Sequence, residues 1–169
     1  MGAARTEEAS TRTEFLLTRP VRRWRWLGGH VLCVAGAVVV LSVVGGAAMW
    51  LASLAADADL TAADTFSAMF NTLPVVAVFA GLAVLVFGVA PRLTVALGAA
   101  AAVVAFVLEL VGPILEWPDW LVGLSPFHHL AAVPIDPVEW PAALAMLAIG
   151  VTLTAVGVLA FERRDLVAA

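Results

Sequence analysis

The sequence has no lysine, a single cysteine and few charged residues of any kind. A phosphate-binding loop of the Walker type needs a lysine and a strand-loop-helix setting, and the stretch Gly28-Gly29-His30 offers neither. Cys33 alone excludes an intrachain disulfide and any metal cluster built from cysteines of this chain. We therefore expect no nucleotide hydrolysis, and we expect Cys33 to be a small apolar residue of a helix.

Scarcity of charge also decides the class of protein. Only 13% of the 169 residues are charged and 63% are hydrophobic, which argues against a water-soluble globular domain. About 20 apolar residues suffice for a helix to cross the hydrocarbon core. The sequence predicts an all-α integral membrane protein with a cytoplasmic arm at 1–26 and a transmembrane domain at 27–169, whose four spans lie at about 27–56, 66–90, 93–115 and 142–161.

The positions of the charges predict the orientation of the spans. All nine arginines fall in the arm, in the Pro91-Arg92 turn or in the C-terminal tail, and an even number of spans separates these regions. Basic residues stay on the cytoplasmic side, so both termini are expected in the cytoplasm of a multi-pass plasma-membrane protein. The two opposite loops contain no arginine and hold the acidic residues Asp57, Asp59, Asp64, Glu116, Asp119, Asp136 and Glu139.

The N-terminal arm contains a short amphipathic segment. Thr11 and Glu14 have the spacing of a capping box, and Pro20 is expected to end the helix near Thr18. The apolar run at 15–17 lies beside charged residues, as in a helix that docks into a partner or rests on a membrane surface. The alternative is a basic tail that only follows the charge rule.

The stretch 116–141 interrupts the pattern of spans. It holds five prolines, three tryptophans, two histidines and four carboxylates within 26 residues, yet its centre is fairly apolar. We interpret it as a short re-entrant or interfacial helical hairpin on the outer side. Proline lacks the backbone donor of a helix, so Ser125-Pro126 is the expected break between its halves.

Few residues are candidates for metal binding or catalysis. Adjacent histidines such as His128-His129 point in different directions on a helix, which disfavours a shared metal ion, and we expect an ordinary polar role for them. Glu109 lies within a span, where ionisable groups are costly, and either has a mechanistic role or reaches interfacial water near the outer end. Ser125, His128 and Asp119 form only a loose combination in a proline-rich loop, so no catalytic residue, metal or cofactor is predicted.

Three pairs of glycines are each seven residues apart and so lie on one helix face: Gly29 and Gly36, Gly81 and Gly88, Gly150 and Gly157. Small residues let helix backbones approach closely. These faces either form an oligomer interface or pack spans of this chain together.

A series of motifs resembles one family. Glu7-Glu8 is followed by TEFLLTRPVRR at 13–23 and WRWLGGH at 24–30, with Phe87-Gly88 ahead of Pro91-Arg92, LSPF at 124–127 and FERRDL at 161–166. In this order they resemble the membrane (permease) subunits of type-2 ATP-binding-cassette (ABC) exporters, particularly the actinobacterial antibiotic and polyketide exporters. The resemblance covers nearly the whole chain.

The resemblance implies a function and partners. The chain would be the permease component of a bacterial exporter for a hydrophobic, antibiotic-like small molecule, driven by a separate cytoplasmic ABC ATPase. The arm would be the coupling helix, with the ATPase contact made by Glu14, Phe15, Leu16, Leu17, Arg19, Arg22 and Arg23. The outer hairpin would cap the translocation path, with Glu109, Ser125, Pro126 and Phe127 as gating or outer-loop residues.

The sequence departs from the family in its number of spans. A family membrane domain normally has six spans with the coupling helix between the second and third, whereas this chain begins at the coupling helix and holds the last four. A second permease chain or half would supply the missing spans. The alternatives are an inactive truncated permease fragment and a small scaffold or accessory subunit without transport activity.

Overall fold

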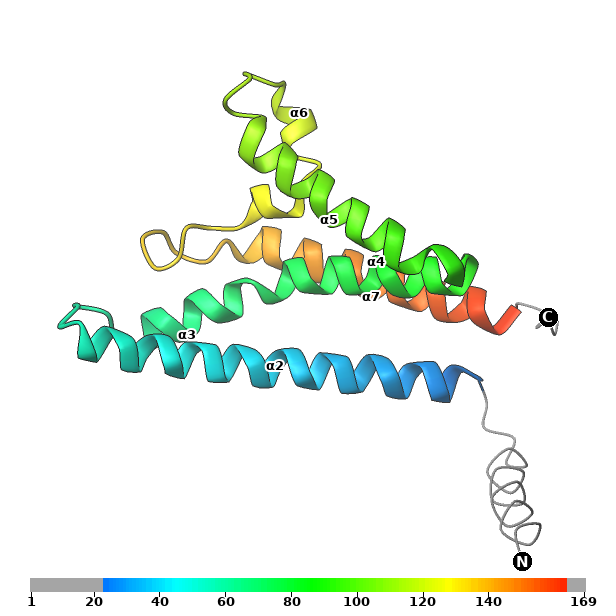
Figure 1. Ribbon diagram of the computed structural model, residues 1–169, viewed down its shortest axis with the longest axis horizontal. Helices are drawn as coiled ribbons and strands as arrows, with labels where there is room; N and C mark the ends of the chain where they lie inside the picture. The colour runs from blue at the N-terminus through cyan, green and yellow to red at the C-terminus, as the bar shows by residue number, and fades with distance from the viewer. Residues whose placement is uncertain (1–22, 164–169) are drawn as a thin grey trace, which may run out of the picture.

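The computed structural model describes residues 23–163, which form a set of long helices joined by short turns (Figure 1). No strand occurs among these residues, so the predicted all-α class is confirmed. The elements are α2 (Arg23–Ala55), α3 (Ala62–Asn71), α4 (Leu73–Val89), the 3-10 helix η1 (Pro91–Leu93), α5 (Thr94–Val111), α6 (Asp119–Val122), the 3-10 helix η2 (Pro126–His129) and α7 (Trp140–Arg163).

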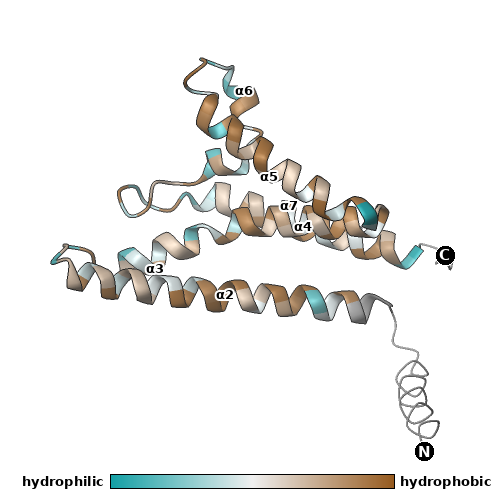
Figure 2. Ribbon diagram, viewed as in Figure 1, coloured by the Kyte–Doolittle hydropathy of each residue, from teal (hydrophilic) through white to brown (hydrophobic). Residues whose placement is uncertain are grey.

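Four helical segments are long and apolar enough to cross a membrane, as predicted, and they run Leu27–Ala55, Ala62–Val89, Pro91–Val111 and Trp140–Arg163. Figure 2 shows the apolar residues along these helices and the hydrophilic ones near their ends. The last segment is two residues longer at each end than the predicted 142–161. Helix α2 itself begins at Arg23, four residues ahead of the predicted start of the first span.

The second span begins earlier than predicted and is broken in the middle. We expected Asp64 in a loop and a span from Phe66, but Thr61 and Asp64 form a capping box that starts α3 at Ala62. The Thr61 Oγ1 accepts from the Asp64 amide at 3.2 Å, and the Asp64 Oδ2 accepts from the Thr61 amide at 2.9 Å. Thr72 then separates α3 from α4, and Pro74 near the start of α4 has no amide hydrogen to continue the α3 ladder.

Helices α4 and α7 lie side by side and form the most extensive contact of the described chain (Figure 1). Gly81 and Gly88 of α4 meet the backbone of Gly150 and Gly157 of α7, and a Cβ placed on Gly157 would come within 2.6 Å of the backbone at Val84. Two of the three glycine pairs therefore pack spans of this chain together. Near the pair Gly88 and Gly157, the rings of Phe87 and Phe161 pack in a tilted arrangement with centroids 5.5 Å apart.

Helix α2 packs against α3 through its C-terminal half. Gly45 and Gly46 face the side chains of Met69 and Phe66, whose nearest atoms would lie 3.1 Å and 2.8 Å from an added Cβ. The glycine face of the N-terminal half of α2 is open by contrast, because Gly29 and Gly36 have nothing within 4 Å of such a Cβ, although Leu27 on this half is buried. The third glycine pair therefore has no packing partner among residues 23–163.

Two helices end on an acidic residue in the left-handed region. Asp57 (φ 53°) follows α2 and Glu116 (φ 52°) follows the turn after α5. Each helix end is closed by a backbone bond across five residues, from Ala58 to Ser53 (2.9 Å) and from Trp117 to Gly112 (2.9 Å). Regular helix α5 itself ends at Val111, four residues before the predicted limit of the third span, and residues 112–116 continue as turns up to this closure.

The segment between α5 and α7 has less helix than the predicted hairpin. Helix α6 is a single turn, η2 follows it, and Ser125 lies between them as the N-cap of η2. The break therefore falls at Ser125-Pro126, where the sequence placed it. Residues 130–139 form no helix, since Pro134 and Pro137 remove two backbone donors from this short stretch.

Candidate functional site

The predicted site residues fall into two groups. Six of the predicted ATPase-coupling residues lie outside the described part of the chain: Glu14, Phe15, Leu16, Leu17, Arg19 and Arg22. Arg23 is the first residue of α2, and its side chain is likewise outside the description. The structure brings the other group, Glu109, Ser125, Pro126 and Phe127, together where α5 meets η2.

Ser125 anchors this cluster, which we call the outer cluster; it includes part of residues 112–139 between α5 and α7, the outer segment, named after its expected side of the membrane. Its side chain is fully buried, and its Oγ donates to the carbonyl of Ala105 in α5 at 2.9 Å while accepting from the amide of Phe127 at 3.2 Å. The same hydroxyl thus caps η2 and fastens it to a helix 20 residues earlier in the chain. Pro126, at the first position of η2, has the fixed φ that suits the start of a helix.

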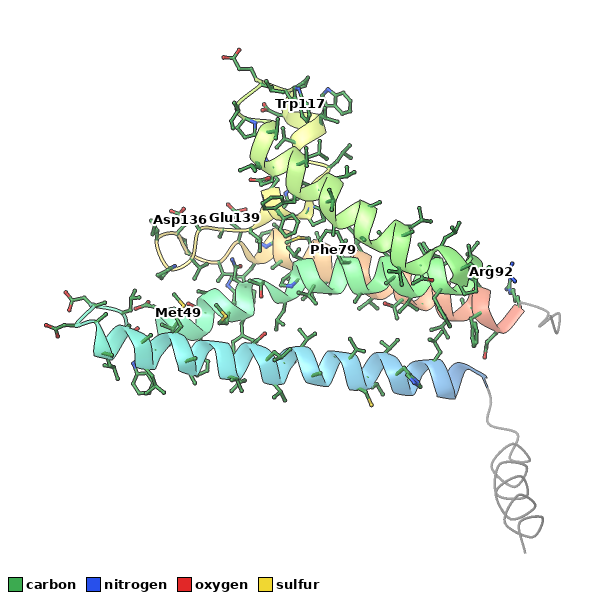
Figure 3. The ribbon with its side chains drawn as sticks, viewed as in Figure 1. Met49, Phe79, Arg92, Trp117, Asp136 and Glu139 are labelled. Atoms are coloured by element: carbon green, nitrogen blue, oxygen red, sulfur yellow. The ribbon has the colours of Figure 1, made fainter. Side chains whose placement is uncertain are left out.

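Phe127 lies between two helices. Its ring centroid is 5.6 Å from that of Phe79 in α4 and 6.5 Å from that of Phe106 in α5, the latter in an edge-on arrangement. Figure 3 shows Phe79 on the side of α4 that faces this segment. Aromatic pairs of this kind add about 0.5–1.5 kcal/mol each beyond the area they bury. Phe127 therefore joins the outer segment to both helices at once.

Glu109 and His128 add a charged contact to the cluster. The Glu109 Oε2 lies 3.4 Å from the His128 Nδ1 and makes no hydrogen bond. This oxygen is itself shielded from solvent, although the Glu109 and His128 side chains as a whole are 37% and 44% exposed. The contact is therefore only partly open to solvent. The neighbouring His129 Nε2 lies 2.9 Å from the carbonyl of Gly123, so the two histidines have different partners.

One further bond ties the outer segment to the second span. The Asn71 Nδ2, at the end of α3, donates to the carbonyl of Ala131 at 3.0 Å, across 60 residues of sequence. Sequence reasoning did not select Asn71, nor the two aromatic partners Phe79 and Phe106. A signal for Asn71 was present, since it is the sole asparagine of the chain and lies inside an apolar run, where polar side chains are costly.

The cluster is arranged for packing and positioning. The Ser125 proton is donated to a backbone carbonyl, so this hydroxyl is not activated by His128. Within residues 23–163 no three His, Cys, Asp or Glu side chains are grouped closely enough to hold a metal ion. What the geometry provides is a short outer segment fastened to α3, α4 and α5 by a few directional contacts.

Two comparisons with known proteins found matches to this chain. The family described as "Multidrug efflux system permease Rv1217c, C-terminal domain" matches residues 1–162. The chain belongs to this family. It is also 33% identical over 165 residues to the multidrug efflux system permease protein Rv1217c of Mycobacterium tuberculosis (strain ATCC 25618 / H37Rv), covering 94% of this chain and 29% of that protein.

Family membership confirms the resemblance to the C-terminal part of an efflux permease and, with the four apolar helices, places the protein in a membrane. The chain spans less than a third of the length of the relative, since 29% of that protein is matched. Both the family and the relative are named as multidrug efflux system permeases.

Proposed function

We propose that this chain is the C-terminal membrane domain of an ABC exporter permease that moves a hydrophobic, antibiotic-like molecule out of the cell. A separate ATPase subunit supplies the energy, and the chain performs no covalent chemistry. Family membership carries the proposal, because the relative is named as a multidrug efflux system permease. The mechanism is alternating exposure of an apolar path to the two sides of the membrane.

The distribution of charge supports an orientation. Arg92 lies at the opposite end of the molecule from Asp136 and Glu139 (Figure 3), and Arg163 ends α7 near the Arg92 turn. Basic residues favour the cytoplasmic side, so in the proposed arrangement the Arg92 end faces the cytoplasm of a bacterial inner membrane. The start of α2 lies at this same end (Figure 1), which is where an ATPase contact in the arm is required.

Exposed apolar faces support a second permease half as partner. In α2, Leu32 is 74% and Leu41 68% exposed, and in α5 Val95 is 84% exposed. Helix α5 diverges from α4 beyond η1 (Figure 1), so its inner face is little covered by this chain. In the proposed exporter, spans from the other half complete the walls of the path next to these helices.

The coupling step is assigned to the arm. We place Glu14, Phe15, Leu16 and Leu17 in a cleft of the ATPase, with Arg19, Arg22 and Arg23 beside lipid phosphates or acidic residues of that partner. The apolar edge at 15–17 supports this, because an amphipathic helix binds a groove through such a face. Helix α2 follows directly and carries the displacement to the opposite end of the membrane domain.

The scaffold alternative loses part of its support. It relied on glycine faces that contact other proteins, yet Gly81, Gly88, Gly150 and Gly157 are used between α4 and α7. Of the three glycine pairs, only Gly29 and Gly36 lack a packing partner among residues 23–163 and could contact another chain.

The deciding experiment compares native permease with a Phe15→Asp, Leu16→Asp variant. The tagged permease is purified with its ATPase in detergent, and ATP-driven uptake of the hydrophobic dye ethidium is measured in inverted membrane vesicles. We expect the native protein to retain the ATPase and accumulate dye. The variant should lose both, because two carboxylates cannot enter an apolar cleft without a large desolvation cost.

An Ala3→Asp, Ala4→Asp variant is the matched control, since it adds the same charge to the arm ahead of the apolar edge. It should behave as the native protein, with equal amounts of all three in the membrane. Retention of ATPase and dye uptake by the Phe15, Leu16 variant would refute the coupling assignment. Absence of ATP-driven uptake for the native protein, over several hydrophobic dyes, would refute transport.

A further inference from the structure

The described helices form two packing pairs that are joined in sequence at one point. Helices α2 and α3 pack together, as do α4 and α7, whereas α3 and α4 make few contacts although they follow each other in the chain, and a smaller contact between α2 and α7 also links the pairs. The joint is Thr72, which ends α3 and begins α4, with Pro74 just beyond it. Missing backbone bonds at a proline allow a helix to bend, so the two pairs have a built-in place to pivot.

Asn71 bridges this joint to the outer segment. Its amide group is half-buried at the last position of α3, and it donates to the carbonyl of Ala131 at 3.0 Å. The other polar side chains of α3 and the joint bond within their own turn: Thr65 to Ala62, Ser67 to Asp64 and Thr72 to Met69. Within the described residues, the hydrogen bond between α3 and a distant part of the chain is therefore made by the side chain of Asn71.

The acceptor, the Ala131 carbonyl, lies in a stretch of chain that further backbone hydrogen bonds hold in place. The Ala131 carbonyl also accepts from the Val133 amide at 2.9 Å, and the Leu130 amide donates to Phe127 at 3.1 Å. A force applied at Ala131 is therefore transmitted within a few residues to Phe127 and His128. These are the residues that attach the segment to α4 and α5, through Phe79 and Glu109 respectively.

We propose that Asn71 is a positioning residue that makes the outer segment follow the α2–α3 pair. When α2 is displaced, α3 pivots at Thr72 and the Asn71 to Ala131 bond pulls the segment away from its contacts with α4 and α5. The outer end of the path opens by this movement. The inference rests on the proposed function, since displacement of α2 is the step driven by the ATPase.

The first test measures the attachment itself and needs no transport. Spin labels are placed on cysteines at Ala63 in α3 and at Ile135 in the segment, both exposed, in a Cys33→Ser background of the permease as the cell makes it. We expect a narrow distribution of distances in the native protein and a broad one in Asn71→Leu, which keeps the size of the side chain but lacks the donor. Equal widths in both would overturn the proposal.

The second test measures coupling. In vesicles with the ATPase, Asn71→Leu should keep native ATP hydrolysis but lose about three- to tenfold in ethidium transported per ATP, the range expected for one bond within a membrane protein. Asn71→Gln keeps an amide donor and should restore most of the loss. Ser67→Ala removes a hydroxyl whose bond stays within α3 and should match the native ratio. An unchanged ratio in Asn71→Leu would overturn the proposal.

The two tests separate the two ideas. If native permease fails to transport, the proposed function is refuted, while the spin-label comparison still decides whether Asn71 holds the segment. If Asn71→Leu does not accumulate in the membrane, Asn71→Gln and Asn71→Ser supply the comparison, because they retain donors of different reach. If the width of the distance distribution between the two labels is the same with Asn, Gln or Ser at position 71, the proposed attachment of the segment by Asn71 is refuted.

Discussion

The two helix pairs use glycine in different ways. In the α4–α7 pair the glycines face backbone atoms of the opposite helix, whereas in the α2–α3 pair Gly45 and Gly46 face side chains. A backbone cannot move aside without disturbing its helix, while a side chain can change rotamer. The first contact therefore holds two helices as one rigid unit, and the second leaves α3 attached to α2 but adjustable. The difference fits a domain in which one pair stays fixed while the other moves.

Gly150→Ala should break the rigid pair and have the largest effect. The new Cβ would lie 2.6 Å from the carbonyl carbon of Ala77 and 3.1 Å from its Cβ, so α4 and α7 must separate. Overpacking of this kind typically costs about 1–3 kcal/mol, and backbone atoms of the opposite helix place this site toward the upper end. We expect a large loss of thermal stability of the permease in detergent, measured by size-exclusion chromatography after heating. A midpoint within one degree of native would contradict the backbone contact.

The sequence was sufficient for the class, the four spans and the break at Ser125-Pro126, because each depends on local composition. The pairing of glycines was not predictable, since Gly29 with Gly36 has the same spacing as Gly81 with Gly88 and Gly150 with Gly157. Spacing shows that two glycines share a helix face but contains no information on what lies opposite. The start of α3 was missed because the capping box from Thr61 to Asp64 was interpreted as part of an acidic loop.

The outer cluster was partly predictable for the same reason. Ser125, Pro126 and Phe127 are adjacent in sequence, so one motif selected all three, and Glu109 was conspicuous as a charge in a span. Phe79, Phe106 and Asn71 reach the cluster from other helices. A contact such as Asn71 to Ala131 depends on the angle between α3 and α4 and cannot be derived from either segment alone.

Gly46→Ala should test the adjustable pair and have an intermediate effect. The Cβ would meet the Phe66 ring at 2.8 Å, which must shift, although the ring is a side chain that can tilt away. Against this cost, alanine favours the helix by about 1 kcal/mol over glycine. We expect a net loss of about 1 kcal/mol or less in the same heating assay. A loss as large as that of Gly150→Ala would show that the α2–α3 contact is as rigid as the α4–α7 contact.

Gly36→Ala should have the smallest effect and, within this chain alone, a favourable one. Nothing lies within 4 Å of the added Cβ, so no packing is lost, and the helix gains up to about 1 kcal/mol. Stability in the heating assay should therefore be native or slightly higher. The informative variant is Gly36→Leu, compared with Gly98→Leu on α5, another glycine with nothing within 4 Å of an added Cβ.

If this face of α2 meets only lipid, Gly36→Leu is tolerated in stability and in dye transport. If another part of the permease packs against it, Gly36→Leu lowers both, because a leucine there would force that neighbour away. Gly98→Leu reports in the same way on the α5 face, which the proposed second half also covers. Native stability and dye transport in Gly36→Leu would assign the open glycine pair to the lipid.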